Sequence, residues 1–181
     1  APLVLLALDA SNAGWNEVAR VLFRGRSLML LEHTVVLAAL VVVLSGVLGL
    51  AAAWATERCA LPGRRVWTVL LVLPIAVPDF VVGYSWHSFA PRMDPLLAAT
   101  VVMTLGTYPL VYLPVSAALR RTDPVIAETA HSLGVGRTRT FLRVSLPLLS
   151  TALLGGSVLV VLTVISEYGA FEIVRYSTFT T

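Results

Sequence analysis

The sequence predicts an all-α protein that crosses a membrane several times. Of its 181 residues, 57% are hydrophobic and only 13% are charged, whereas about 25% of the residues in a soluble domain are charged. The apolar residues form long stretches separated by short polar segments, and a chain of this length has room for about four or five helical spans. The predicted fold class is therefore a polytopic membrane protein, a helical bundle whose outer surface faces lipid.

The first predicted span is residues 35–55, which contain no charged side chain. A helix of this length covers about 30 Å, the thickness of the hydrocarbon core of a bilayer. Three further spans are predicted at about residues 66–86, 96–119 and 144–166. The second contains Pro74 and Pro78, so we expect a broken backbone there that faces protein or a water-filled cavity.

The distribution of arginine predicts the orientation. All thirteen basic residues are Arg, and eight of them lie in segments 56–65 and 120–143 together with only three acidic residues. The segments on the opposite side hold five Arg and six acidic residues. Because cytoplasmic loops of membrane proteins are enriched in basic residues, both Arg-rich segments are predicted to be cytoplasmic. This explains the basic clusters without a nucleic-acid partner.

The segment after the third span predicts a short helix over about residues 124–133. Asp123 is a suitable N-cap, and Pro124 suits the first helical position, where no amide donor is needed. Gly134 suits the position after the helix, where a left-handed backbone is common. Such a helix is too short and too polar to cross a bilayer, so it either rests at the membrane surface or docks on a partner. In the fourth span, the pair Gly155–Gly156 is expected to allow close helix packing.

The same segment contains an ordered set of residues: Glu128, Thr129, Ala130, Gly134, Val144, Leu146 and Pro147. Their spacing resembles the cytoplasmic signature of permease subunits of binding-protein-dependent importers powered by ATP-binding cassettes. That signature reads Glu-Ala-Ala, three residues, Gly, nine residues, an aliphatic residue, one residue, and Leu-Pro. Thr129 departs from it, because the family has Ala there. The resemblance implies the type I importer permease fold.

The resemblance also implies a mechanical role and a set of partners. The short helix would seat in a cleft of a cytoplasmic ATPase subunit, and the seven signature residues would couple the two proteins. An extracytoplasmic substrate-binding protein and a second permease half, identical or fused in tandem, complete such importers in the bacterial inner membrane. This chain would perform no covalent chemistry and need no cofactor, and its sequence lacks the phosphate-binding loop that would bind ATP.

Two regions are candidates for the substrate pathway. Asp79 lies within a predicted span, where charged residues are costly and often functional, although it could instead cap the broken helix. Segment 166–181 resembles the corresponding part of permeases for ferric iron and, less closely, thiamine. Its Glu167, Tyr168 and Glu172 offer hard oxygen ligands for a passing cation, although the segment could be an ordinary polar loop. Ferric iron is the expected cargo, with thiamine, a polyamine or an oxyanion as alternatives.

The sequence argues against two other classes of function. A passive channel or membrane scaffold would need no docking helix. An intramembrane hydrolase using Glu167 or Asp79 would need a second catalytic group at membrane depth, and the sequence offers no convincing one. The three histidines, His33, His87 and His131, have no ligand spacing, so no metal site is expected. The abrupt ends of the sequence favour a truncated fragment of a longer polypeptide.

Overall fold

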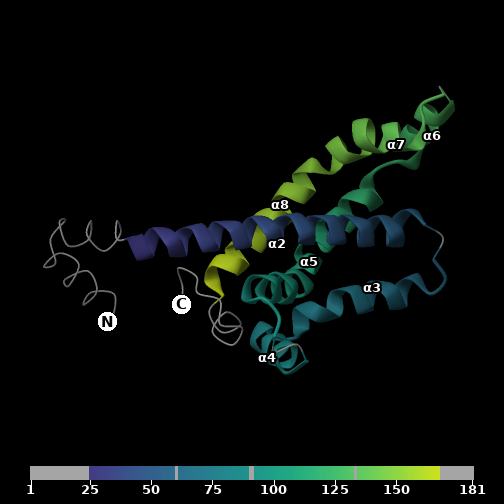
Figure 1. Ribbon diagram of the computed structural model, residues 1–181. Coiled ribbons are helices and arrows are strands. Elements are labelled where there is room, and N and C mark those ends of the chain that lie inside the picture. The colour runs from purple at the N-terminus through teal and green to yellow at the C-terminus, as the bar shows by residue number, and fades with distance from the viewer. Residues whose placement is uncertain (1–24, 60, 90–91, 133, 168–181) are drawn as a thin grey trace, which may run out of the picture.

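The structure is a computed structural model that describes residues 25–59, 61–89, 92–132 and 134–167. All regular elements in these ranges are helical, which confirms the predicted fold class. Three long helices form the body of the molecule: α2 (Gly25–Arg58), α5 (Pro95–Arg121) and α8 (Leu146–Ser166). Helix α5 packs against both α2 and α8, so it is the central helix of the bundle (Figure 1).

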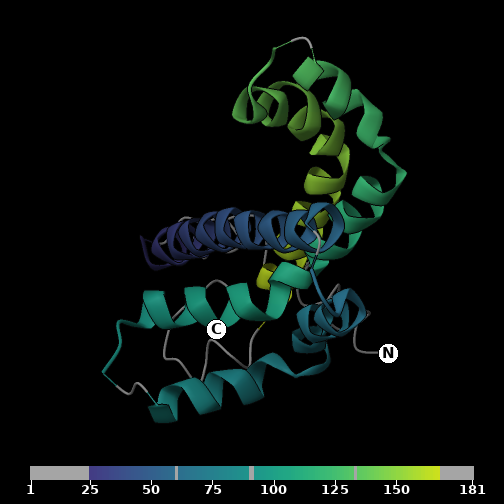
Figure 2. The same cartoon turned by 90° about the vertical axis from the view of Figure 1, so that its right-hand side faces the viewer.

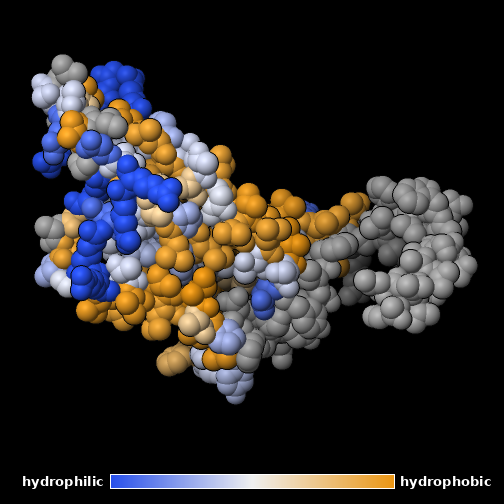
Figure 3. All heavy atoms as spheres, turned by 180° about the vertical axis from the view of Figure 1, so that it is seen from behind, coloured by the Kyte–Doolittle hydropathy of each residue, from blue (hydrophilic) through white to orange (hydrophobic). Residues whose placement is uncertain are grey.

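The surface of the bundle suits a lipid environment. Three helical segments of the described chain are long and apolar enough to cross a membrane, at Leu28–Arg58, Pro95–Arg121 and Arg137–Ser166. Large apolar side chains such as Val43, which is 61% exposed, point outward from them. Figure 3 shows hydrophobic residues over the middle of the molecule and hydrophilic residues gathered at one end. Such a broad exposed apolar surface is stable in a bilayer and unstable in water.

Small residues bring the three long helices together. A methyl group added to Gly49 of α2 would lie 2.8 Å from the Val111 Cβ, and one added to Gly156 of α8 would lie 2.8 Å from the Val111 Cα. The backbones of α2 and α8 therefore approach α5 closely at the level of Val111. The close packing expected at the glycine pair is confirmed for Gly156, whereas an added methyl at Gly155 would meet open space.

The predicted span at 66–86 is not one continuous helix. It is divided into α3 (Arg64–Val72), the 3-10 helix η1 (Leu73–Ala76) and α4 (Asp79–Phe89). The break comes at Val77, whose backbone is extended with φ −95° and ψ 122°, because the ring of Pro78 disfavours a helical conformation in the residue before it. The break expected from the prolines is confirmed, and a membrane crossing by this segment stays a prediction.

The chain leaves α5 through the short helices α6 (Pro124–Ser132) and α7 (Arg137–Thr140). Helix α7 continues through a five-residue π-helix, η2 (Phe141–Ser145), into α8, so this helical segment starts seven residues earlier than the predicted span at 144–166. Pro147 explains the π-helix, because it cannot donate to the carbonyl of Arg143 and its ring would clash with that carbonyl. In Figure 2 the green segment with α6 and α7 extends away from α3 and α4.

Candidate functional site

Helix α6 is held at both ends by local interactions. At its start, the Asp123 Oδ1 accepts a hydrogen bond from the Val125 amide at 3.0 Å. At its end, Gly134 has φ 80°, and the Val135 amide donates to the Ala130 carbonyl at 3.0 Å. This bond and the positive φ are the features of a Schellman helix ending. The predicted cap at Asp123 and the predicted left-handed turn at Gly134 are both confirmed.

The described side chains of α6 face outward. Val125 is 56% exposed, and Glu128, Thr129 and Ser132 are also exposed, whereas Ala130 is half-buried. Within the bundle α6 packs against α7, and it lies at the tip of the molecule (Figure 1). A short helix that is capped at both ends, with four described side chains exposed to solvent, offers a partner a rigid surface.

The remaining signature residues lie where the chain turns back into the bundle. Val144 belongs to the π-helix η2, and Leu146 and Pro147 open α8. Val144 and Leu146 are half-buried, and Pro147 is exposed. The signature therefore covers two structural parts, the projecting helix α6 and the widened turn through which the chain enters α8, with Gly134 between them.

A buried carboxylate at the end of α2 connects this helix to α3 and α5. The Glu57 side chain, at the end of α2, is only 2% exposed. Its Oε1 accepts hydrogen bonds from the Ser116 Oγ at 2.7 Å and the Arg120 Nε at 2.8 Å, and its Oε2 pairs with Arg64 at the start of α3. We call Glu57, Arg64, Ser116 and Arg120 the Glu57 cluster. It links α2 and α3 to the last two turns of α5, close to the place where α5 leads into α6.

Arg58 makes a second link at the same level. Its Nη2 donates to the carbonyl oxygens of Leu119 and Thr122, at 3.2 and 3.0 Å. Carbonyls at the end of a helix lack intrahelical donors, and a cation there is favourable. Arg58 therefore fixes the end of α2 to the residues that precede α6. The two predicted Arg-rich segments accordingly lie at the same end of the bundle.

Sequence reasoning missed the Glu57 cluster, because it treated Glu57 as an ordinary charge in a loop. One signal was available: Glu57 is the only acidic residue in a short segment with Arg58, Arg64 and Arg65. A lone carboxylate among several arginines at a helix end favours an ion-paired role. The partner on α5, Arg120, could not have been identified from spacing, because it lies 63 residues away.

The candidate pathway residues are only partly described. Asp79 is the first residue of α4, directly after the break at Pro78, and its side chain lies outside what the structure describes. Glu167 follows the last residue of α8 and is half-buried. Tyr168 and Glu172 lie outside the described residues. Within the described ranges, no three His, Cys, Asp or Glu side chains gather closely enough to hold a metal ion.

Comparison with known proteins decides the family. Residues 45–178 match the family described as "binding-protein-dependent transport system inner membrane component". The chain belongs to this family. The match includes all seven signature residues, the Glu57 cluster and the long helices α5 and α8, so the candidate site lies wholly within the region that defines an inner membrane component of this kind.

Several individual proteins are similar to this inner membrane component. The Fe(3+)-transport system permease protein FbpB 2 of Haemophilus influenzae is 35% identical over 180 residues, which cover 99% of this chain and 36% of the relative. The sulfate transport system permease protein CysT of Salmonella typhimurium is 29% identical over 184 residues, which cover 93% of this chain and 66% of the relative. The molybdenum transport system permease protein ModB of Escherichia coli is 30% identical over 141 residues, 67% of this chain and 60% of the relative. The chain thus spans about a third of the first of these proteins.

Proposed function

We propose that this inner membrane component is the permease part of an ATP-driven importer, in which α6 docks on a cytoplasmic ATP-binding-cassette subunit. The observation that carries the proposal is the exposed, doubly capped helix α6 at the Arg-rich end of a family-matched bundle. Basic residues mark the cytoplasmic side of membrane proteins, so α6 faces the compartment that contains ATP. The exposed carboxylate of Glu128 would pair with a basic group of the ATPase subunit.

The proposed role of the chain is to transmit movement. Closure of the ATPase subunits around ATP would displace α6. Helices α5 and α8 would move with it, because α6 follows α5 in the chain and leads through α7 and η2 into α8. The Glu57 cluster and Arg58 would carry the displacement to α2 and α3. The bundle would then alternate between inward-open and outward-open states without any covalent step in this chain.

The remaining partners follow from the same proposal. A substrate-binding protein outside the inner membrane would deliver the cargo. A second permease half, identical to this one or fused to it in tandem, would complete the pathway. Thr129, Ala130 and the signature residues that open α8 would shape the surface and the turn that the ATPase subunit contacts.

Ferric iron is the proposed cargo. It is supported by the identity of 35% with the Fe(3+)-transport permease protein across nearly the whole chain. Hard oxygen donors at Glu167, Tyr168 and Glu172 would suit a hard cation, and Asp79 would add a further carboxylate. An oxyanion is the second candidate, because sulfate and molybdenum permease proteins also match much of the chain.

The test is uptake by the full transporter, reconstituted in vesicles with its ATPase subunits and binding protein. We expect ATP-dependent uptake of ferric iron that excess sulfate or molybdate does not inhibit. Glu128→Gln should reduce uptake at least about tenfold while the protein still inserts. Glu32→Gln, which changes an exposed Glu at the start of α2, should leave uptake unchanged.

The possible failures can be told apart. Uptake of sulfate or molybdate in place of iron would overturn the proposed cargo, whereas the proposal of an ATP-driven importer would still hold. Uptake that needs no ATP, or that continues fully in Glu128→Gln, would overturn the importer proposal and favour a channel or scaffold.

A further inference from the structure

A groove lies between α2 and the segment formed by α7 and η2, at the Arg-rich end of the bundle. Its volume is about 940 Å³. Two adjacent rows of α2, each with residues four apart, form one wall: Val47, Ala51 and Ala55, and Leu50, Trp54 and Arg58. The opposite wall includes Phe141, whose ring meets the Trp54 ring edge-on with 5.0 Å between the ring centres.

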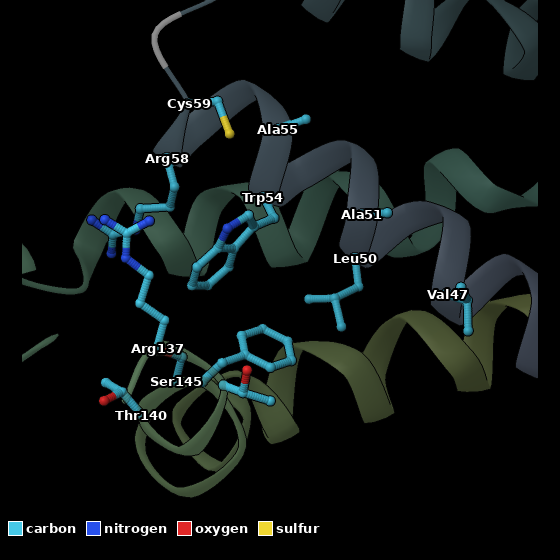
Figure 4. Close-up of a pocket in the computed structure, with 12 residues that line it drawn as sticks. Val47, Leu50, Ala51, Trp54, Ala55, Arg58, Cys59, Arg137, Thr140 and Ser145 are labelled. Carbon is cyan, nitrogen blue, oxygen red and sulfur yellow. The ribbon is translucent and has the colours of Figure 1, made fainter. Parts of the chain in front are cut away.

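Positive charge is concentrated at one end of this groove. Figure 4 shows the side chains of Arg58 and Arg137 reaching the same end, with Val47 at the far end. Among the described residues, no acidic side chain lines the groove and neither arginine pairs with a carboxylate. The hydrogen bonds of Arg58 go to two neutral carbonyls, so its positive charge remains uncompensated.

The other end of the groove is apolar and open to the surface. Val47 is 60% exposed, and Val43, one turn further along α2, is similarly exposed. Arg58 lies eleven positions after Val47 in the same helix, which is about 16 Å of rise. This is close to half the thickness of a hydrocarbon core of about 30 Å. Trp54 lies between the two ends, and Trp is enriched at the level of lipid headgroups.

We propose that this groove is a binding site for an anionic phospholipid. The phosphate would bind Arg58 and Arg137, and one acyl chain would lie along Trp54, Leu50 and Val47. Basic pockets between spans on the cytoplasmic side are a favourable arrangement for acidic headgroups. The long apolar wall favours a lipid over a soluble anion, which would leave that wall uncovered.

The site would have a consequence for coupling. Arg58 belongs to α2, and Arg137 belongs to the segment that follows α6. A bound headgroup would therefore bridge the membrane bundle and the projecting segment. This inference depends on the location of the family in the inner membrane. It depends neither on the identity of the cargo nor on the docking of α6.

Trp54 provides a direct test. In the full-length protein, purified in detergent, Trp15, Trp67 and Trp86 are replaced by Phe, so that Trp54 is the fluorophore within this chain. Any Trp elsewhere in the full-length protein is replaced in the same way. The protein is then titrated with brominated phosphatidylglycerol or brominated phosphatidylcholine, both of which quench nearby Trp. We expect phosphatidylglycerol to bind at least about fivefold more tightly.

Charge variants separate this site from general lipid contact. Each basic residue near a membrane surface contributes about a fivefold change in affinity for an acidic lipid, so Arg137→Gln should weaken phosphatidylglycerol binding by about that factor. Arg137→Lys should largely preserve binding. Arg139→Gln is the matched control, because Arg139 lies on the same short helix and does not line the groove, and it should change nothing.

Three results would overturn the proposal. Equal quenching by both lipids, unaffected by Arg137→Gln, would mean that Trp54 meets only bulk lipid. Absence of quenching by either lipid would mean that protein, from a second copy or another part of the chain, fills the groove. Relief of quenching by millimolar sodium phosphate would identify a soluble anion as the ligand.

Discussion

Gly156 of α8 lies so close to Val111 of α5 that a methyl group on Gly156 would come within 2.8 Å of the Val111 Cα. The contact is with the backbone of the central helix, which cannot turn aside as a flexible side chain can. A methyl group added to Gly49 of α2 would likewise meet the backbone of α5, at 2.9 Å from the Tyr112 amide nitrogen. The spacing of the three long helices therefore depends on the absence of a side chain at Gly49 and Gly156.

The first prediction concerns this contact. Gly156→Ala should lower the free energy of unfolding by about 1–3 kcal/mol, because overpacking forces the backbones of α5 and α8 apart. Thermal unfolding of the purified full-length protein in detergent measures the change. Gly155→Ala is the control, because nothing lies within 4 Å of the added methyl group, and it should leave stability unchanged or slightly raised. Equal effects of the two variants would contradict the packing described.

The second prediction concerns the Glu57 cluster. Glu57→Gln keeps the size of the side chain and removes the charge that holds Arg64 and Arg120, so the protein should lose about 1–3 kcal/mol of stability. Thermal unfolding again provides the measurement. Glu32→Gln, which changes an exposed side chain of α2, should have little effect. If both variants unfolded at the wild-type temperature, the cluster would contribute nothing to the bundle.

The third prediction concerns the end of α6. Gly134→Ala forces a side chain into a left-handed backbone with φ 80°, which costs about 1–2 kcal/mol. The strain should shift α7 relative to α6 and reduce ATP-driven uptake, with partial recovery in Gly134→Asn because Asn tolerates this conformation. Gly136→Ala, at φ −62°, should preserve uptake. A fully active Gly134→Ala would show that the turn is not needed.

The fourth prediction concerns a buried hydroxyl. Thr104 is 4% exposed, and its Oγ1 has no hydrogen-bond partner within the described chain. Thr104→Val should therefore raise stability by about 1 kcal/mol, because an unsatisfied buried polar group is removed. Thr100→Val removes a hydroxyl that donates to the Leu96 carbonyl at 2.7 Å, and it should not stabilise. A lower unfolding temperature for Thr104→Val would mean that this hydroxyl has a partner in the full protein.

Sequence reasoning succeeded where structure depends on neighbouring residues. The cap at Asp123 and the turn at Gly134 each involve backbone groups only a few residues away, so residue type and position are sufficient to predict them. The break before Pro78 is local for the same reason. The apolar stretches indicated long helices because a helix that crosses the hydrocarbon core must contain about 20 mostly apolar residues.

Sequence reasoning failed where the interacting residue lies far away in the sequence, and where a polar segment forms a helix. Ser116 lies 59 residues from Glu57, so no local pattern indicates that they meet. Helix α7 begins at Arg137, seven residues before the predicted span, because helix formation does not require an apolar sequence when the segment continues into a long helix. The site of proposed coupling could be located by its spacing, whereas its attachment to α2 and α3 required the structure.

Site-specific crosslinking tests the central claim, that α6 meets an ATPase subunit in the cytoplasm. Cys59 is first replaced by Ser, which leaves this chain without its only cysteine. In intact cells that express the full transporter, Glu128→Cys on α6 should crosslink to the ATPase subunit, and Leu154→Cys on the exposed apolar face of α8 should not. Absence of any adduct from Glu128→Cys, or its labelling by a membrane-impermeant thiol reagent added outside the inner membrane, would contradict the account.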